Sequence, residues 1–155
     1  MLSHLRCLTS LNLSSADSTA VFTTLAREGI FLSHIVVEDV DDRVLDYLES
    51  CGSSIKQLEM TCIRLNTAEE SDRLARHFIE RILPKVVDSI QVLKIKPLYE
   101  GEWCYSCDGR LSSILSQCNG LTQLAIALVS KPSPTMHESK ANFDNEVCLR
   151  VLMCV

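Results

Sequence analysis

The chain has 155 residues, enough for one domain or a part of one. Apolar residues make up 46% and charged residues 23%, with 5 Gly and 4 Pro, which excludes the disordered and fibrous classes. The formal net charge of −5 argues against a nucleic-acid partner. No apolar run is long enough to span a membrane, and the first residues do not have the form of a secretory signal.

The chain contains 8 cysteines in a sequence rich in aliphatic residues. Cytosolic proteins keep their thiols reduced, and a free cysteine behaves as a small buried hydrophobe. Most of these cysteines are therefore expected to be core thiols of a cytoplasmic or nuclear protein. The exception to consider is the pair Cys104 and Cys107, which is spaced as C-x-x-C.

A hexapeptide of the form L-x-x-L-x-L recurs along the chain. Its copies are Leu8–Leu13, Leu32–Val37, Ile55–Met60, Ile90–Ile95 and Leu121–Ile126. The steps between their middle aliphatic residues are 24, 23, 35 and 31 residues. Two steps fall in the range of about 20–29 residues that a short strand followed by a helix occupies. The two longer steps require insertions.

Each interval between these hexapeptides carries a helical pattern. The apolar residues at helical spacing are Val21, Phe22, Leu25 and Ala26, then Val44, Leu45, Leu48 and Cys51, then Leu74, Phe78 and Ile82, then Leu111, Ile114 and Leu115. Asp41 or Asp42 is the expected cap of the second helix, and Thr67 with Glu70 reads as a capping box for the third. Pro84 is expected to end or kink that third helix.

Glycines close three of these helical segments. We expect Gly29, Gly52 and Gly120 each to leave a helix with a positive φ, which costs glycine little. The alternation of strand and helix predicts an α/β fold with a parallel sheet on one side and helices on the other. A single strand–helix unit cannot bury its own apolar face, so the units must stack into a solenoid of about five units.

The segment Asp41–Cys51, followed by Ile55, Leu58 and Met60, ends a helix in Cys directly before the next strand, and Ser116–Leu121 repeats this arrangement. Over roughly residues 5–129 the chain resembles the leucine-rich repeat family, and in particular its cysteine-containing subclass. The resemblance implies a partial horseshoe, with the sheet on the concave side and the helices on the convex side. That subclass is common in F-box substrate receptors of ubiquitin ligases, so the resemblance also implies a substrate-recognition role in such an adaptor.

The sequence departs from the family in two respects. The positions that usually carry a ladder of Asn or Cys are apolar here, namely Ala16, Val40, Ile63, Leu98 and Val129. No candidate F-box precedes the first strand, which begins near Leu5 without a polar cap. We therefore expect a fragment, a truncated product, or a protein that self-associates through its N-terminal edge.

The domain expected from these patterns is a leucine-rich repeat solenoid over residues 1–129. Residues 130–155 are expected to form a linker and tail, because Lys131–Thr135 contains two prolines. Leu149-x-x-Leu152-x-Cys154 in the tail is a degenerate copy of the hexapeptide and a candidate sixth strand.

Alternate strand residues should point away from the helices. The candidate partner-binding residues are His34, Val36, Glu38, Gln57, Glu59, Thr61, Val92, Lys94 and Lys96. Acidic groups lie in the middle of the array and two lysines follow one strand later, a surface suited to a partner with a complementary charge pair. The alternative is an ordinary solvated sheet face.

A different class of function would use the loop that contains Cys104 and Cys107. This C-x-x-C pair can supply half of a structural zinc site, which needs four ligands, and no second pair follows it. The alternative to a protein-interaction module is thus a zinc- or thiol-dependent protein. No nucleotide-binding, zinc-protease or hydrolase motif occurs, so we expect no catalysis, metal or cofactor.

Overall fold

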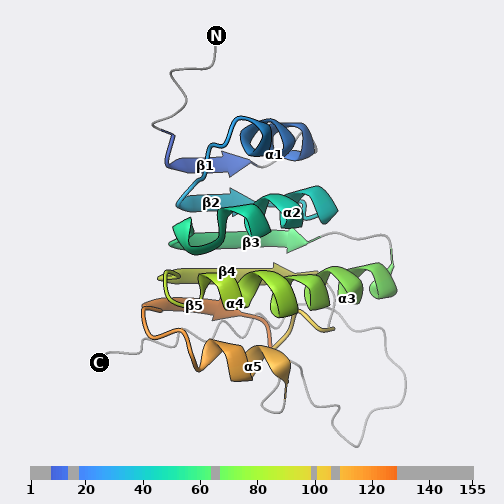
Figure 1. The fold of residues 1–155 in the computed structure, drawn as a ribbon. Helices are drawn as coiled ribbons and strands as arrows, with labels where there is room; N and C mark the ends of the chain where they lie inside the picture. The colour runs from blue at the N-terminus through green and yellow to red at the C-terminus, as the bar shows by residue number, and fades with distance from the viewer. Residues whose placement is uncertain (1–7, 14–17, 64–66, 99–100, 106–108, 129–155) are drawn as a thin grey trace, which may run out of the picture.

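The computed structural model describes residues 8–13, 18–63, 67–98, 101–105 and 109–128. Strands and helices alternate along the chain, as predicted for an α/β protein (Figure 1). The elements are β1 (Ser10–Leu13), α1 (Ser18–Arg27), β2 (His34–Val37), α2 (Asp42–Cys51), a 3-10 turn (Gly52–Ser54), β3 (Gln57–Ile63), α3 (Ala68–His77), a π-helical turn (Phe78–Ile82), α4 (Leu83–Val86), β4 (Val92–Pro97), α5 (Arg110–Leu115) and β5 (Gln123–Ile126).

The strands form one parallel sheet of five strands in the order β1-β2-β3-β4-β5. The five strands predicted at the hexapeptides are therefore confirmed, and each lies beside its neighbour in sequence. The register joins the middle aliphatic residues of the hexapeptides into one row across the sheet, Leu11, Ile35, Leu58, Leu93 and Leu124. The shared hexapeptide pattern accounts for this register, because matching the strands in this way also aligns their apolar residues.

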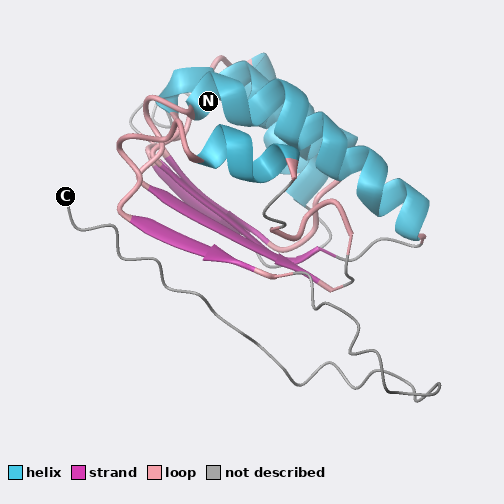
Figure 2. Cartoon of the chain, turned by 90° about the horizontal axis from the view of Figure 1, so that it is seen from below, coloured by secondary structure: helices cyan, strands magenta, loops and turns pink. Residues whose placement is uncertain are grey.

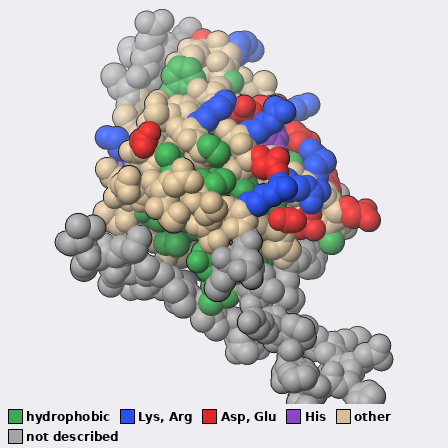
Figure 3. Space-filling model, turned by 60° about the horizontal axis from the view of Figure 1, so that its bottom comes forward, with side chains coloured by type: hydrophobic (Ala, Val, Ile, Leu, Met, Phe, Trp, Pro, Cys, Tyr) green, Lys and Arg blue, Asp and Glu red, His purple; other side chains and the backbone are tan. Residues whose placement is uncertain are grey.

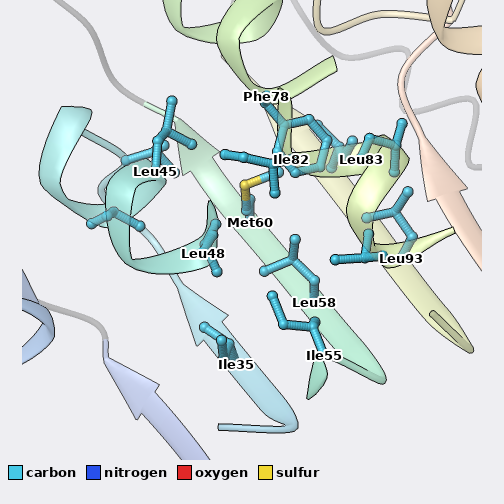
Figure 4. Close-up of a cluster of buried hydrophobic side chains, with 14 of the residues drawn as sticks. Ile35, Leu45, Leu48, Ile55, Leu58, Met60, Phe78, Ile82, Leu83 and Leu93 are labelled. Atoms are coloured by element: carbon cyan, nitrogen blue, oxygen red, sulfur yellow. The ribbon is translucent and has the colours of Figure 1, made fainter. Parts of the chain in front are cut away.

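The helices lie on one face of the sheet (Figure 2). Apolar residues of β2, β3 and β4, and the apolar residue two positions before each of these strands, are buried on the helix side. Nine of them are 0% exposed: Leu32, Ile35, Val37, Ile55, Leu58, Met60, Ile90, Leu93 and Ile95. Figure 4 shows side chains from α2 and from the long helix that includes Phe78 reaching down around Leu58 and Met60. These side chains and the sheet residues form one continuous apolar core.

A second regular feature is a backbone contact at the start of each strand from β2 to β5. Two successive N–H groups of a strand donate to one carbonyl of the preceding strand, as Ser33 and His34 do to Thr9 at 3.0 Å each. The accepting carbonyls belong to Thr9, Ser33, Lys56 and Gln91, which occupy the second position of their hexapeptides. These carbonyls link the strands where the strands begin. The positions at which the sequence lacks a ladder of Asn or Cys lie at the opposite side, at or after the strand ends.

A buried tyrosine links α2 to the turn before β2. The Tyr47 hydroxyl accepts from the Leu32 N–H at 3.2 Å and donates to the Ile30 carbonyl at 3.0 Å. Both backbone groups are buried, so without Tyr47 they would each lack a partner at a cost of about 1–3 kcal/mol. The Tyr47 ring also packs against Phe22 of α1, with ring centroids 4.9 Å apart.

The expected caps are present, but Pro84 does not end its helix. Asp41 caps α2 by accepting from the Val44 N–H at 2.9 Å, and Thr67 caps α3 by accepting from the Glu70 N–H at 3.2 Å. The chain continues in helical form past Pro84 to Val86. The π-helical turn before it explains why, because it places Pro84 in the first turn of α4, where the missing N–H costs little.

The expectation for the glycines is correct for two of the three. Gly29 and Gly52 have φ of +64° and +48°, in the region that favours glycine, whereas Gly120 is not among the residues with positive φ. A Cβ at Gly120 would meet the Ile90 carbonyl at an ordinary 3.5 Å, so this position does not require glycine.

Residues 130–155 lie outside the described residues, and so do the predicted linker, the tail and the candidate sixth strand. Within the described residues, no helix has the length and apolar character needed to cross a membrane.

Candidate partner-binding face

The nine predicted partner-binding residues lie on the sheet face away from the helices, hereafter the open face. In β2 and β4 the side chains alternate between half-buried on this face and fully buried on the other. No described helix covers the open face (Figure 2). The alternation that the sequence predicted for these strands therefore places the candidate residues together.

The sheet register arranges these residues in rows that cross the strands. His34, Gln57 and Val92 form one row, and Val36, Glu59 and Lys94 form the next. Thr61 and Lys96 face each other at the far end of β3 and β4, just before the β3–β4 register shifts. Glu38 follows β2 directly, and its side chain is half-buried.

Glu59 is the centre of a hydrogen-bonded cluster on this face. Its Oε1 accepts from the Lys94 Nζ and from the Gln57 Nε2, both at 2.8 Å. The Glu59 and Lys94 side chains are 16% and 30% exposed, so water screens this pair less than it would a fully exposed one. The cluster fixes three long side chains from two strands in one arrangement.

This pairing adds a contact that the sequence did not predict. Glu59 and Lys94 were expected on one surface suited to a partner with a complementary charge pair, and the structure pairs them with each other across β3 and β4. The sequence spacing could not reveal this, because the two residues are 35 positions apart and meet only through the sheet register. A partner at the centre of the open face therefore meets a neutral polar cluster rather than a free acid and a free base.

Apolar and aromatic groups flank the cluster. Val36 and Val92, from the strands on either side of β3, are half-buried on the open face. The His34 Nδ1 lies 2.9 Å from the Ser33 Oγ, which in turn donates to the Thr9 carbonyl at 3.1 Å. Ser33 thus orients the His34 ring, a role that the sequence analysis did not assign to it.

On the helix face, charged side chains pair between successive helices. Arg73 of α3 holds Asp42 of α2 through two contacts of 2.7 and 2.8 Å. Glu49 of α2 contacts the Lys85 Nζ at 2.8 Å and the His77 Nε2 at 3.3 Å. These contacts lower the pKa of both carboxyl groups, Asp42 through Arg73 and Glu49 through Lys85 and then His77.

Further along the helix face, Arg110 of α5 pairs with Glu80. In Figure 3, basic and acidic side chains lie intermixed over one side of the molecule, with no separate basic or acidic patch on the visible surface. These charges serve contacts within the chain, so the helix face has fewer groups left to recognise a partner.

The loop after β4 is held against α3. The Asp72 Oδ1 accepts from the Glu102 N–H at 3.0 Å, and the Arg76 guanidinium lies 3.8 Å from the Glu102 carboxylate. Trp103 is 1% exposed, and its ring packs against Phe78 with centroids 5.6 Å apart. The sequence did not predict that this loop is anchored on α3, although Trp103, the single Trp of the chain, was a visible signal.

Cys51 and Cys118 are buried and free of disulfide bonds, as expected. Cys51 is the last residue of α2, and Cys118 follows α5 in the turn before β5. Burial raises the pKa of both thiols, which leaves less of the reactive thiolate at neutral pH.

We therefore expect a thiol reagent to modify Cys51 and Cys118 slowly in the folded protein and rapidly after unfolding. Peptide mass spectrometry at intervals after addition of iodoacetamide would measure both rates, with the urea-unfolded chain as the control. Modification of both sites in the native protein as fast as in urea would contradict this placement.

The alternative thiol site is described only in part. Cys104 is buried, whereas Cys107 lies outside the described residues. Among the residues that the structure describes, no group of three or more His, Cys, Asp or Glu side chains could hold a metal ion.

Comparison of the chain with protein-family models, with curated proteins and with solved structures gives no match in any of the three. The functional argument therefore depends on the geometry of the chain itself.

Proposed function

We propose that this protein is an interaction module that binds a protein partner through the open face of its sheet. The observation that carries the proposal is a parallel sheet whose described helices all lie on one face (Figure 2). Parallel sheets are normally covered on both faces, and the main exceptions are solenoids, which use the uncovered strands to bind partners. A rigid sheet holds its side chains in fixed positions, which limits the entropy lost on binding.

The binding centre we propose is the row of Val36, Glu59 and Lys94. Val36 supplies an apolar contact, while the Glu59–Lys94 pair supplies polar groups already held in place by the contact of 2.8 Å. A few central groups usually carry most of the affinity of an interface, and rim charges mostly tune association rate and salt dependence. Glu38 and Lys96 therefore belong to the rim.

The finer proposal is that the stacked strand–helix units form a leucine-rich repeat solenoid. The single row from Leu11 to Leu124 and the shared carbonyl contacts at the strand starts support it. By resemblance, such a module could read substrates for a ubiquitin-ligase adaptor in the cytoplasm or nucleus. An F-box encoded upstream in the same reading frame would support the adaptor role over a stand-alone scaffold.

The test is affinity capture with the full chain as bait, using a double variant of the open face. We expect Val36→Asp with Glu59→Lys to abolish capture of a partner that the wild-type bait retains. The first change puts a charge in the apolar contact, and the second places a lysine beside Lys94, so the neutral cluster is lost.

The matched control is Ala26→Asp with Asp46→Lys, which makes the same charge changes at exposed positions of α1 and α2. This variant should retain the partner, and circular dichroism should show both variants folded. Leu98→Asp tests the loop after β4, where Leu98 is exposed. If capture survives the open-face changes and is lost with Leu98→Asp, the loop is the functional surface and the proposal is wrong.

The second candidate is the zinc- or thiol-dependent protein that uses Cys104 and Cys107. Metal analysis of the purified chain distinguishes the two, because stoichiometric zinc that is lost in a Cys104→Ser, Cys107→Ser variant would favour the second candidate.

A further inference from the structure

The outermost strand β1 has a neighbour on one side only in the described sheet. Its pairing with β2 uses the carbonyls of Thr9 and Leu13, which accept from the N–H groups of His34 at 3.0 Å and Glu38 at 3.3 Å. The N–H and C=O of one strand residue point to the same side, and successive residues alternate. Ser10 and Asn12 therefore direct their backbone groups outward, away from β2.

In its described residues this short edge strand lacks two of the devices that keep edge strands apart. Residues 8–13 contain no charged residue and no proline, although charges and proline are the usual means of preventing strand addition. In the described part of α1 and the turn after it, the charged residues Arg27 and Glu28 contact each other at 3.2 Å. The whole chain has a net charge of −5, but the described charged residues at this end, Arg27 and Glu28, neutralise each other. Two copies can therefore approach at β1 without repulsion between these residues.

The apolar row is also incomplete at this end. Ile35, Leu58 and Leu93 are fully buried, whereas Leu11 in the same row is only half-buried. A contact beyond β1 on the helix side of the sheet would complete the burial of Leu11.

We propose that β1 pairs antiparallel with β1 of a second copy of this chain, around a two-fold axis at Leu11. In this register Leu11 faces Leu11 of the second copy, and Ser10 faces Asn12 of that copy. The outward groups of Ser10 and Asn12 then form the two hydrogen-bonded pairs that flank a non-hydrogen-bonded pair, in which side chains approach most closely. Leu11 of one copy and Leu11 of the second copy thus bury each other.

The self-complementary register favours a second copy over a foreign strand. A two-fold contact uses the same patch on both molecules and closes, whereas joining β1 to β5 of another copy would generate an open filament. The pairing leaves the helix faces and open faces of both copies uncovered. This inference is therefore independent of the proposed function, and either one can fail alone.

The first test is a crosslink on the full-length chain. We expect Leu11→Cys to give an interchain disulfide on treatment with oxidised glutathione, because cysteines facing each other in a non-hydrogen-bonded pair are close enough to bond. Leu13→Cys is the matched control, since in the proposed register residue 13 faces residue 9 and lies far from its own counterpart. Both variants keep the native cysteines, so non-reducing gels compare them directly.

The second test removes the outward N–H of Asn12. Asn12→Pro should raise the dimer dissociation constant measured by sedimentation about tenfold or more, because two of the proposed intermolecular hydrogen bonds lose their donor. The β1–β2 pairing does not use this N–H, and edge strands accept proline where the N–H faces outward. Asn12→Ala, which keeps the N–H, should dimerise like the wild type.

A wild-type chain that stays monomeric at high micromolar concentration would overturn the proposal. Crosslinking of Leu13→Cys as readily as Leu11→Cys would also overturn it. So would equal dimer dissociation constants for the Asn12→Pro and Asn12→Ala variants when both are folded. Should Asn12→Pro fail to fold, the crosslinking comparison decides alone.

Discussion

Leu58→Ala should lower the free energy of unfolding by about 2–5 kcal/mol, the usual range for a fully buried leucine. Leu58 is 0% exposed and lies in the central strand of the sheet, with Ile35 and Leu93 beside it in the register. Strands on both sides prevent the site from collapsing around the smaller side chain, so most of the cavity remains. Urea denaturation followed by circular dichroism would measure the change.

Leu124→Ala is the control for Leu58→Ala, because Leu124 occupies the same row in the edge strand β5 but is only half-buried. Its loss should cost clearly less, since a side chain that is partly exposed loses less transfer free energy when it is truncated. Equal destabilisation by the two changes would contradict the view that burial increases from the edges of the sheet to its centre.

Much of the fold was predictable because one short pattern recurs. A hexapeptide with aliphatic residues at its first, fourth and sixth positions specifies a strand that is buried on one side. When neighbouring strands carry the same hexapeptide, matching it in register also matches the apolar rows. The row of Leu11, Ile35, Leu58, Leu93 and Leu124 is the result.

The contacts that were not predictable join residues far apart in sequence. Glu59 meets Lys94 because β4 lies beside β3, and neither residue carries a local signal of that pairing. The π-helical turn before Pro84 is a second case, since a proline in a helical pattern normally predicts an end or a kink. In both cases the local sequence permits several outcomes, and tertiary packing selects one.

The candidate face was predictable in composition but not in electrostatics. Strand alternation alone assigned nine residues to one side of the sheet, and the register arranges them in rows. The acidic and basic groups at the centre form a pair with each other, which the alternation could not reveal. A binding model based on the sequence would therefore overstate the charge that a partner meets there.

Trp103→Ala should destabilise the protein by about 3–5 kcal/mol, the range for a large buried aromatic residue. Trp103 is 1% exposed and packs on Phe78, and it is the residue by which the loop after β4 enters the core. The loop would keep its contacts from Asp72 and Arg76 to Glu102, but these are exposed and individually weak. Thermal unfolding monitored by circular dichroism would give the shift.

Trp103→Phe is the informative comparison, because the buried Trp103 Nε1 has no hydrogen-bond acceptor among the residues that the structure describes. Burying an unpaired donor costs about 1–3 kcal/mol, so removing it should offset much of the packing lost with the smaller ring. We expect Trp103→Phe to lie within about 1 kcal/mol of the wild type. If it costs as much as Trp103→Ala, the indole N–H has a partner in solution, and the polar end of the side chain, more than its ring, anchors the loop.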